Sequence, residues 1–318
     1  MVEQKWRRAR RLPVAACVLL LPVTLLAASC RHDETANPAP SRDGAVVVAS
    51  FSFPESDLLA EIYAQALEAE GVPVRRELAL GSRELVLPAL QQGLVDVVPE
   101  YLGTALASVA SVPTLDVHDV PAVRAALDEA LRPWGLQTLE PSAAANQNGV
   151  VVTRGIARRL GLRTVSDLLT VSDGLTLAGP PECPPRPYCL RGLRQHYGLR
   201  FDRFLPLDTE AQRVAALDQE LADVAVLFTT DGRLATGDLV LLEDDRRLQP
   251  AENVLPVVST RVLHRYDGLV EQTLDRVSAR LTTGNLRFLN WRVGVAGKER
   301  ADEARGWLRR HGLLTATR

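Results

Sequence analysis

The segment LGSRELVLPALQQGLVDVVPEYLGT, residues 80–104, contains two predicted strands and the helix that joins them. One strand ends at Leu80, and Gly-Ser-Arg then leads into an apolar helical run that stops at Gly93. The second strand covers residues 94–98 and is followed by Pro-Glu-Tyr and Gly-Thr. In an open α/β sheet, ligands bind beyond the carboxyl ends of the strands. The segment therefore predicts half of a binding cleft.

The residues before this segment extend the same pattern. Residues 45–50 (AVVVAS) are a continuous apolar run with the length of a strand that is buried on both faces. Residues 55–70 carry apolar side chains at helical spacing, and residues 74–80 form the next strand. Residues 45–98 therefore read β-α-β-α-β, which predicts a parallel sheet with right-handed crossovers.

A second unit with the same alternation follows residue 146. A polar turn at residues 146–149 is expected to precede its first strand, and the polar turn at 229–232 follows a later one, as Glu100 and Tyr101 follow a strand in the first unit. The expected strands are residues 150–153, 175–178, 201–206, 222–228 and 239–242.

The tail after residue 251 has one further predicted strand, residues 253–258, and is otherwise helical. Because it has no sheet of its own, we expect it to pack on the first unit. The first unit would then be discontinuous, and the chain would cross between the units twice, near residues 146–150 and 251–256. Two α/β units that face each other across such crossings form a cleft that can close.

The first 29 residues have the pattern of a secretory signal. A basic region is followed by an apolar run, residues 12–28, and by small residues before Cys30. This pattern resembles a bacterial lipoprotein signal, in which the cysteine is lipidated and becomes the new N-terminus. A plain membrane anchor is the alternative, but the run is short and contains Pro13 and Pro22. We expect residues 30–43 to be a tether and the protein to be extracytoplasmic, anchored by lipid to the outer face of the cytoplasmic membrane.

Charge and cysteine content fit this location. Residues 30–318 carry 32 basic and 38 acidic side chains, a net charge of −6, which argues against a nucleic-acid partner. Cys183 and Cys189 lie in a proline-rich loop and are expected to form a disulfide in an oxidising compartment. A metal pair is the alternative, but it needs further ligands, and the nearest histidine, His196, stands alone on a predicted helix.

The sequence contains few signs of catalysis. The sequence contains neither the P-loop motif Gly-x-x-x-x-Gly-Lys-Ser/Thr nor the dinucleotide-binding motif Gly-x-Gly-x-x-Gly. It also lacks the Gly-x-Ser-x-Gly motif that carries the nucleophile of many hydrolases. The five histidines are scattered, and the acidic residues 243–245 read as a charged turn rather than a metal cluster. These observations favour a binding protein over an enzyme and predict neither cofactor nor metal, although folding can bring distant residues together.

Several segments together resemble one family. They are residues 81–104, the Phe-Thr-Thr-Asp-Gly of 228–232, residues 239–245 and the Pro-Val-Val of 256–258, together with the lipoprotein signal. They resemble the substrate-binding lipoproteins of ABC importers for glycine betaine, choline and related osmoprotectants, over nearly all of residues 45–312. The resemblance implies a type II periplasmic-binding-protein fold. Lobe 1 would comprise residues 44–146 and 252–318, and lobe 2 residues 147–251. It also implies a monomer that delivers a small molecule to an ABC permease.

The resemblance also implies the ligand-binding residues. The ligand of this family is a quaternary ammonium, which cannot donate hydrogen bonds and is held by ring faces, while a polar or basic group meets its carboxylate. The rings form an aromatic cage around the ammonium group; by position, Tyr101 matches one tyrosine of this cage, and Phe228 stands where the family usually has another. Thr104 matches a threonine that lines the cleft, and Arg186 matches an arginine that binds the ligand carboxylate. The predicted ligand-binding residues are Phe53, Ser82, Arg83, Glu100, Tyr101, Thr104, Asn146, Asn148, Arg186, Phe228, Thr230 and Asp231.

Two cage positions differ from the family pattern. Asn148 and Ala251 stand where tyrosines are usual, and both fall at the predicted crossings. A cage with fewer rings binds a quaternary ammonium weakly, so a more polar ligand or a larger apolar or aromatic ligand is an alternative. Phe51, Phe53 or Tyr188 would be substitute rings.

The predicted residues also have simpler interpretations. Ser82 suits a helix cap, Arg83 and Arg186 suit solvated charges, and Glu100 suits an ion pair outside the cleft. Two functions other than solute delivery are possible on the same fold: an extracellular sensor or interaction protein, and an enzyme.

Overall fold

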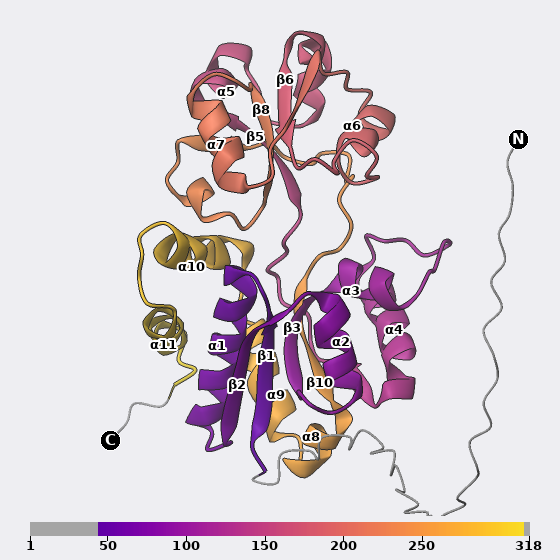
Figure 1. Ribbon diagram of the computed structural model, residues 1–318, viewed down its shortest axis with the longest axis vertical. Helices are drawn as coiled ribbons and strands as arrows, with labels where there is room; N and C mark the ends of the chain where they lie inside the picture. Colours follow the sequence, from indigo (N-terminus) through magenta and orange to yellow (C-terminus); the bar gives the residue numbers. More distant parts are fainter. Residues whose placement is uncertain (1–43, 315–318) are drawn as a thin grey trace, which may run out of the picture. The chain divides into compact units, whose positions relative to one another are not determined.

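The computed structural model describes residues 44–314, whose fold is built on two five-stranded mixed sheets (Figure 1). The first has the order β2-β1-β3-β10-β4 and the second the order β7-β6-β8-β5-β9. The first sheet contains β1 (Val46–Phe51), β2 (Val74–Gly81), β3 (Val97–Tyr101), β4 (Leu136–Thr138) and β10 (Val254–Ser259). The second contains β5 (Asn148–Thr153), β6 (Thr176–Gly179), β7 (Arg203–Pro206), β8 (Val224–Phe228) and β9 (Leu239–Leu241).

Helices cover both sheets. We call the first sheet with its helices lobe 1 and the second sheet with its helices lobe 2. The helices of lobe 1 are α1 (Pro54–Ala69), α2 (Arg83–Gln91), α3 (Leu102–Val109), α4 (Val120–Leu131), α8 (Thr260–Arg265), α9 (Leu269–Ser278), α10 (Thr283–Gly294) and α11 (Arg300–Arg310), with the 3₁₀ helix η1 (Arg132–Trp134). The helices of lobe 2 are α5 (Arg154–Leu160), α6 (Leu190–His196) and α7 (Glu210–Asp218), with the 3₁₀ helices η2 (Ser166–Thr170), η3 (Ser172–Gly174) and η4 (Gly232–Ala235).

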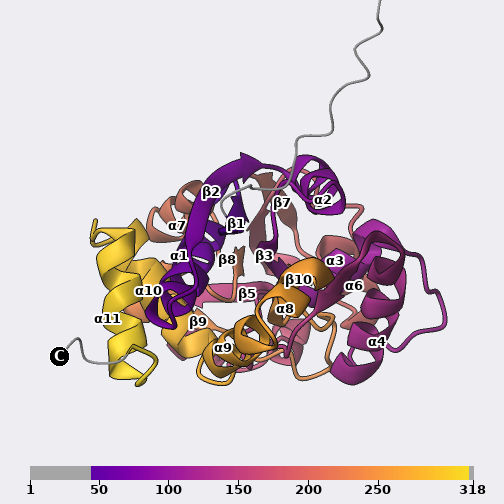
Figure 2. The ribbon, with the colours of Figure 1, turned by 90° about the horizontal axis from the view of Figure 1, so that it is seen from below.

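The alternation of side chains along β1 explains why lobe 1 has a layer on each face of its sheet. Val46 and Val48 lie in one core with residues of α1, α9 and α11, whereas Val47 and Ala49 lie in another core with residues of α2, α3 and α4. Figure 2 shows α11 and α4 at opposite ends of this lobe. Because both faces are covered, every residue of β1 is buried, as the apolar run predicts.

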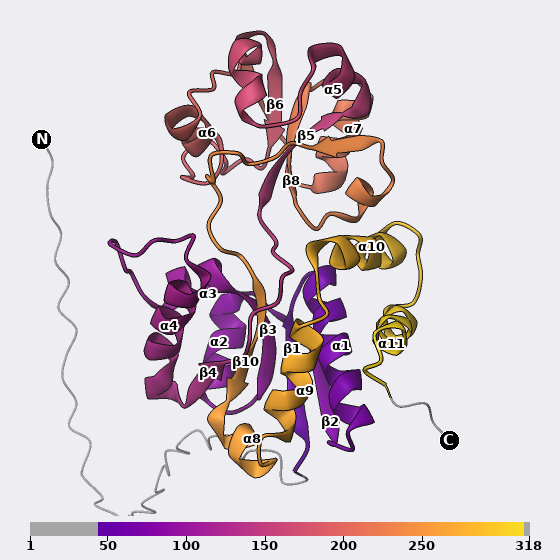
Figure 3. The ribbon, with the colours of Figure 1, turned by 180° about the vertical axis from the view of Figure 1, so that it is seen from behind.

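The chain passes between the sheets twice, after β4 and before β10 (Figure 3). In the first sheet β1 pairs in parallel with β2 and β3, while β10 is antiparallel to its neighbours β3 and β4. The second sheet repeats this arrangement, with β5 antiparallel to β8 and β9. The predicted fold class, two α/β lobes joined by two crossings, is confirmed.

Two local predictions need correction. Glu100 and Tyr101 do not follow the strand but end it, because Tyr101 pairs with Val254 of β10. Asn148 is not a turn residue, because it pairs with Phe228 and begins β5.

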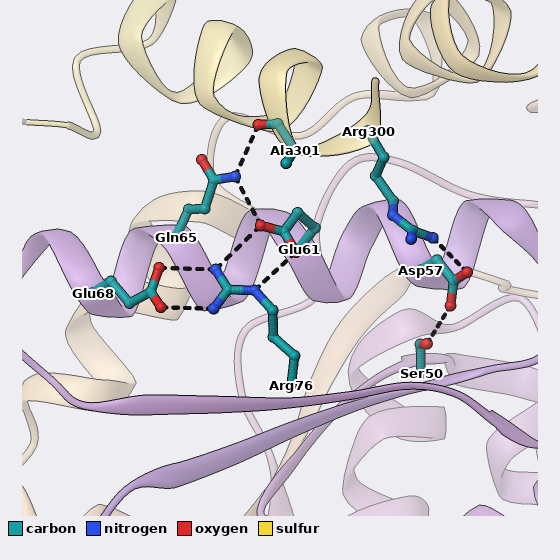
Figure 4. A network of polar contacts seen from close by, with 8 residues as sticks. All are labelled: Ser50, Asp57, Glu61, Gln65, Glu68, Arg76, Arg300 and Ala301. Atoms are coloured by element: carbon teal, nitrogen blue, oxygen red, sulfur yellow. Dashed lines mark hydrogen bonds and ion pairs between the residues drawn. The ribbon is translucent and has the colours of Figure 1, made fainter. Parts of the chain in front are cut away.

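A polar network fixes α1 against β2 and α11 (Figure 4). Arg76 of β2 forms ion pairs with Glu61 and Glu68 of α1, at 2.9 and 2.6 Å. Asp57, at the start of α1, pairs with Arg300 of α11 and accepts a hydrogen bond from the Ser50 hydroxyl. The C-terminal helix is therefore held to the first helix of the lobe.

The disulfide between Cys183 and Cys189 is confirmed. Both cysteines are buried in the core of lobe 2, and their Cα atoms are 5.2 Å apart. The bond closes the loop between β6 and α6. The predicted signal, lipidation site and tether at residues 1–43 lie outside the described residues. Within residues 44–314 no helix is both long enough and apolar enough to cross a membrane.

Candidate functional site

Two adjoining cavities lie between the lobes. The first, which we call the α10 cavity, has a volume of about 620 Å³ and is bordered by lobe 1, lobe 2 and α10. The second, which we call the α6 cavity, has a volume of about 440 Å³ and lies toward the loop before α6. Thr104, Asn146, Phe228 and Glu252 border both cavities, so the two are parts of one cleft.

Three aromatic rings border the α10 cavity. Phe53 and Tyr101 come from lobe 1, with ring centroids 6.1 Å apart, and Phe228 comes from lobe 2. Phe53 and Phe228 remain 38% and 46% exposed, which is unusual for phenylalanine and leaves their ring faces open to a ligand. Phe51 is buried behind Phe53, whereas Tyr188 borders the α6 cavity.

Glu55 holds the Tyr101 ring in place. The Tyr101 hydroxyl donates to Glu55 Oε1 at 2.7 Å, Asn146 Nδ2 donates to the same oxygen at 2.8 Å, and Asn290 Nδ2 donates to Oε2. Glu55 lies in the first turn of α1, where the helix dipole favours a negative charge. Burial, with the nearby Glu55 charge, raises the pKa of Tyr101 well above its ordinary value, so the hydroxyl stays a donor.

Arg83 forms a two-fold ion pair with Glu100. Its Nε and Nη2 donate to the two carboxylate oxygens at 3.0 and 2.8 Å. Burial alone would lower the pKa of Arg83, but the bonds to Glu100 raise it above its ordinary value. The guanidinium also lies over the Phe51 ring at 5.0 Å. The pair therefore supports the wall of the cavity.

Glu252, on the crossing that returns to lobe 1, binds the start of α3. The Thr104 hydroxyl donates to Oε1 at 2.6 Å and the Thr104 amide to Oε2 at 3.1 Å. A Cβ atom at Gly103 would lie 2.7 Å from the Ala251 carbonyl oxygen, so only glycine permits this close approach. Glu252 is 9% exposed, and burial raises its pKa. Ala251 itself lies in the apolar core of lobe 1.

Lobe 2 contributes two further carboxylates. Asp231 Oδ1 accepts from the backbone amide and Nε of Arg233, at 2.8 and 3.0 Å, while Oδ2 has no partner among the described residues. Glu210 accepts a hydrogen bond from the Phe228 amide at 2.8 Å. Burial, and then repulsion by Asp231, raises the pKa of Glu210 to about 7.

The α6 cavity is more polar. Asn148 Nδ2 donates to the Tyr188 carbonyl at 3.1 Å, and Arg186 is exposed in an ion pair with Glu182 at 3.3 Å. Arg213 is 5% exposed and donates to the carbonyls of the β7–α7 loop, but its Nε has no partner among the described residues. The polar wall therefore includes a buried guanidinium that the sequence did not single out.

Comparison with known proteins identifies the family. Residues 44–310 match the family described as the substrate-binding domain of ABC-type glycine betaine transport systems, OpuAC. The chain belongs to this family. The resemblance to substrate-binding proteins of glycine betaine importers is therefore confirmed. OpuAC members are solute-binding proteins of importers, so this one acts outside the cytoplasm and as a binding protein.

Individual relatives of known name support the assignment to the OpuAC family. A glycine-betaine-binding protein of Pseudomonas aeruginosa is 31% identical over 274 residues, which cover 83% of this chain and 86% of the relative. The glycine betaine-binding protein YehZ of Escherichia coli K12 is 29% identical, over 81% of this chain and 88% of the relative. A crystal structure described as a glycine betaine/carnitine/choline ABC transporter has a TM-score of 0.78 and 25% identity, covering 85% of this chain and 100% of that one.

Most residues predicted from the OpuAC resemblance border the cleft. Phe53, Arg83, Tyr101, Thr104, Asn146, Phe228, Thr230 and Asp231 border the α10 cavity, and Asn148 and Arg186 border the α6 cavity. Ser82 instead lies exposed at the start of α2, and Glu100 has its carboxylate on Arg83. No group of described residues could hold a metal ion. The ligand contacts themselves stay a prediction.

The sequence did not single out Glu55, Glu210, Glu252, Asn290 or Arg213. The one available signal was the position of Glu55, just after β1 and next to Pro54 at the start of α1. Asn290 gives no signal, because a polar residue on a helix usually faces solvent.

Proposed function

We propose that this protein captures a small quaternary-ammonium-type solute between its lobes and delivers it to an ABC permease in the membrane. The observation that carries the proposal is the α10 cavity, where Phe53, Tyr101 and Phe228 meet several carboxylates in a member of the OpuAC family. Ring faces attract a methylated cation by about 0.5–2 kcal/mol each, more strongly when water is excluded. The rings come from both lobes, so a bound cation favours the closed arrangement.

Binding is proposed to work by lobe closure alone, without covalent chemistry. A ligand that contacts both lobes stabilises the closed state by its differential affinity for that state. The lobes are proposed to divide at residues 146/147 and 251/252, where the chain crosses. The permease would recognise the closed form, so that only the loaded protein docks productively.

The N-terminal region is proposed to anchor the protein. Residues 1–29 would be a lipoprotein signal peptide, Cys30 the lipidated residue and residues 30–43 the tether, which leaves a monomeric binding unit near its permease. The sequence pattern that supports this is the basic region, the apolar run and the small residues before Cys30. Mass spectrometry of protein extracted from membranes should find the lipid on Cys30; an unmodified Cys30 would refute the anchor.

The proposed function is tested by thermal unfolding of the full chain with candidate solutes. We expect glycine betaine, choline or carnitine to raise the unfolding temperature, whereas sugars and polyols should not; a ligand at 100 times its Kd stabilises by about 2.7 kcal/mol. Tyr101→Ala should abolish the shift, and Tyr101→Phe, which keeps the ring, should retain most of it. A strong shift by an unrelated solute alone would reject the quaternary-ammonium assignment.

A further inference from the structure

Many side-chain hydrogen-bond donors of the α10 cavity are already bound to the protein's own carboxylates. The Arg83 guanidinium binds Glu100, and the Arg233 Nε binds Asp231. Four further side-chain donors at the wall behave in the same way: the Thr104 hydroxyl donates to Glu252, and Tyr101, Asn146 and Asn290 donate to Glu55. A ligand carboxylate that approached any of these groups would have to displace one of these bonds.

The same wall carries carboxyl groups that form no ion pair with the protein's own cations. Among the described residues, Glu55, Glu210 and Glu252 form no ion pair within 4.0 Å, and the first and last are 7% and 9% exposed. Glu55 and Glu252 accept hydrogen bonds from neutral groups only. Buried carboxylates without a positive partner are costly, so a cation that enters the cavity relieves that cost.

Asp231 gives an independent indication that the cavity accepts a positively charged group. It borders the cavity, it is 6% exposed, and its Oδ2 has no hydrogen-bond partner among residues 44–314. A buried carboxylate oxygen normally has a partner. The open ring faces of Phe53 and Phe228 stand at the same wall and suit methyl groups that carry a cationic charge.

We propose that the protein selects a small organic cation without a carboxylate, such as a quaternary ammonium alcohol, over a zwitterionic betaine. We further propose that Glu252 determines this preference, an inference that rests on the proposed function. Glu252 occupies both donors of Thr104, so its own carboxylate fills the place that a ligand carboxylate would take. It also borders both cavities, so its charge acts on a ligand in either half of the cleft.

A betaine has a further place for its carboxylate in the α6 cavity. Arg186 and Arg213, whose Nε has no partner among the described residues, border that cavity, while Phe53 and Tyr101 border the α10 cavity. A zwitterion that uses either arginine must reach from one cavity into the other, past Glu252, which repels its negative end. A cation without a carboxylate meets no such repulsion.

Calorimetric titration of the full chain with choline and with glycine betaine tests the proposal, because the two ligands share a trimethylammonium group and differ mainly in hydroxyl against carboxylate. We expect choline to bind about tenfold more tightly or better. Glu252→Gln should weaken choline binding about tenfold and leave betaine unchanged or stronger, so that the preference shrinks or reverses. Glu129→Gln, the same charge change on an exposed residue of α4, should leave both affinities unchanged.

The outcomes distinguish a failure of the proposed function from a failure of the proposed preference. If neither choline, glycine betaine nor any other quaternary ammonium binds, the proposed function is wrong. If glycine betaine binds the unmodified protein as tightly as choline, only the preference for a carboxylate-free cation is wrong, and this result does not depend on whether a variant folds. If choline is preferred but Glu252→Gln folds and keeps the preference, Glu252 is not the residue that determines it.

Discussion

At the scale of single residues, Glu210 is the cleft carboxyl group that changes its protonation near neutral pH. It is half-buried on α7, next to Asp231, and its pKa is raised to about 7 by burial first and by Asp231 second. Arg213 and Arg233 act in the opposite direction but do not cancel these effects. The carboxyl group is therefore neutral in mildly acidic solution in the native protein, when it would already be ionised in the unfolded chain.

This difference predicts how stability depends on pH. Glu210 contributes stability that is complete below its unfolded pKa of about 4.5 and is lost as the pH rises through about 7, because the unfolded chain ionises first. Glu210→Gln should therefore raise the free energy of unfolding at pH 8 relative to pH 5, by up to about 3 kcal/mol and by less where solvent screens the group. Denaturant unfolding at both pH values measures this difference; equal pH profiles for the variant and the parent would contradict it.

Tyr101 could be predicted from the sequence, but its partner Glu55 could not. Tyr101 belongs to a motif at the end of a strand, and such motifs are visible in a single stretch of sequence. The role of Glu55 depends on donors at positions 101, 146 and 290, which only the fold brings together. The same applies to Glu252 and Thr104, which are 148 residues apart in the chain.

At the scale of elements, α10 lies next to lobe 2 (Figures 1 and 3), and its residues border the α10 cavity. Arg287 of α10 donates to the Thr229 carbonyl at 2.8 and 3.0 Å, and Asn290 donates to the Thr230 carbonyl at 2.9 Å. A Cβ atom on Gly232 would lie 2.4 Å from the backbone nitrogen of Trp291, so η4 packs against the helix backbone itself. The helix therefore adds a contact between the lobes besides the two crossings.

A substitution at Gly232 tests this contact. Gly232→Ala places a methyl group against backbone atoms that cannot rotate away, so η4 and α10 must separate, at a cost of about 1–3 kcal/mol in the free energy of unfolding. Amide hydrogen exchange should then speed up in α10. Gly284→Ala, in the same helix, meets only the Thr282 hydroxyl at 4.0 Å and should be neutral or slightly stabilising. Equal exchange in both variants would show that the contact is dispensable.

Elements with a continuous apolar or periodic pattern could be predicted, and those that depend on a distant partner could not. β1 and α1 follow directly from their side-chain patterns. The helix α3 did not, because Gly103 and Thr104 look like a turn and the Glu252 carboxylate that binds its first turn lies far away in the sequence. The strand position of Asn148 depends likewise on pairing with Phe228.

At the scale of the whole molecule, we expect the two lobes to close over a ligand rather than to move freely, because the two crossings and α10 connect them. Two lobes held at three places can pivot only in a way that keeps α10 close to η4. A bound ligand should reduce the radius of gyration, which small-angle X-ray scattering of the full chain measures with and without choline or glycine betaine. Gly232→Ala should change the value for the free protein more than that for the bound protein. An unchanged radius on ligand addition would contradict closure.

The two-lobed fold could be predicted because two β-α-β units and a tail without its own sheet permit few arrangements. The division of the cleft into two cavities could not. It depends on where α10 lies and on how closely the returning crossing approaches α3 at Gly103. Neither feature has a local pattern in the sequence.

The carboxyl groups of the cleft that form no ion pair have a kinetic consequence. A concave surface with an excess of one charge attracts oppositely charged solutes from a distance and accelerates their diffusional encounter, and dissolved salt screens this attraction over a Debye length of about 8 Å at 0.15 M ionic strength. Capture of a cation by the cavity with Glu55, Glu210 and Glu252 would therefore slow as salt accumulates, whereas encounter with an uncharged zwitterion would not.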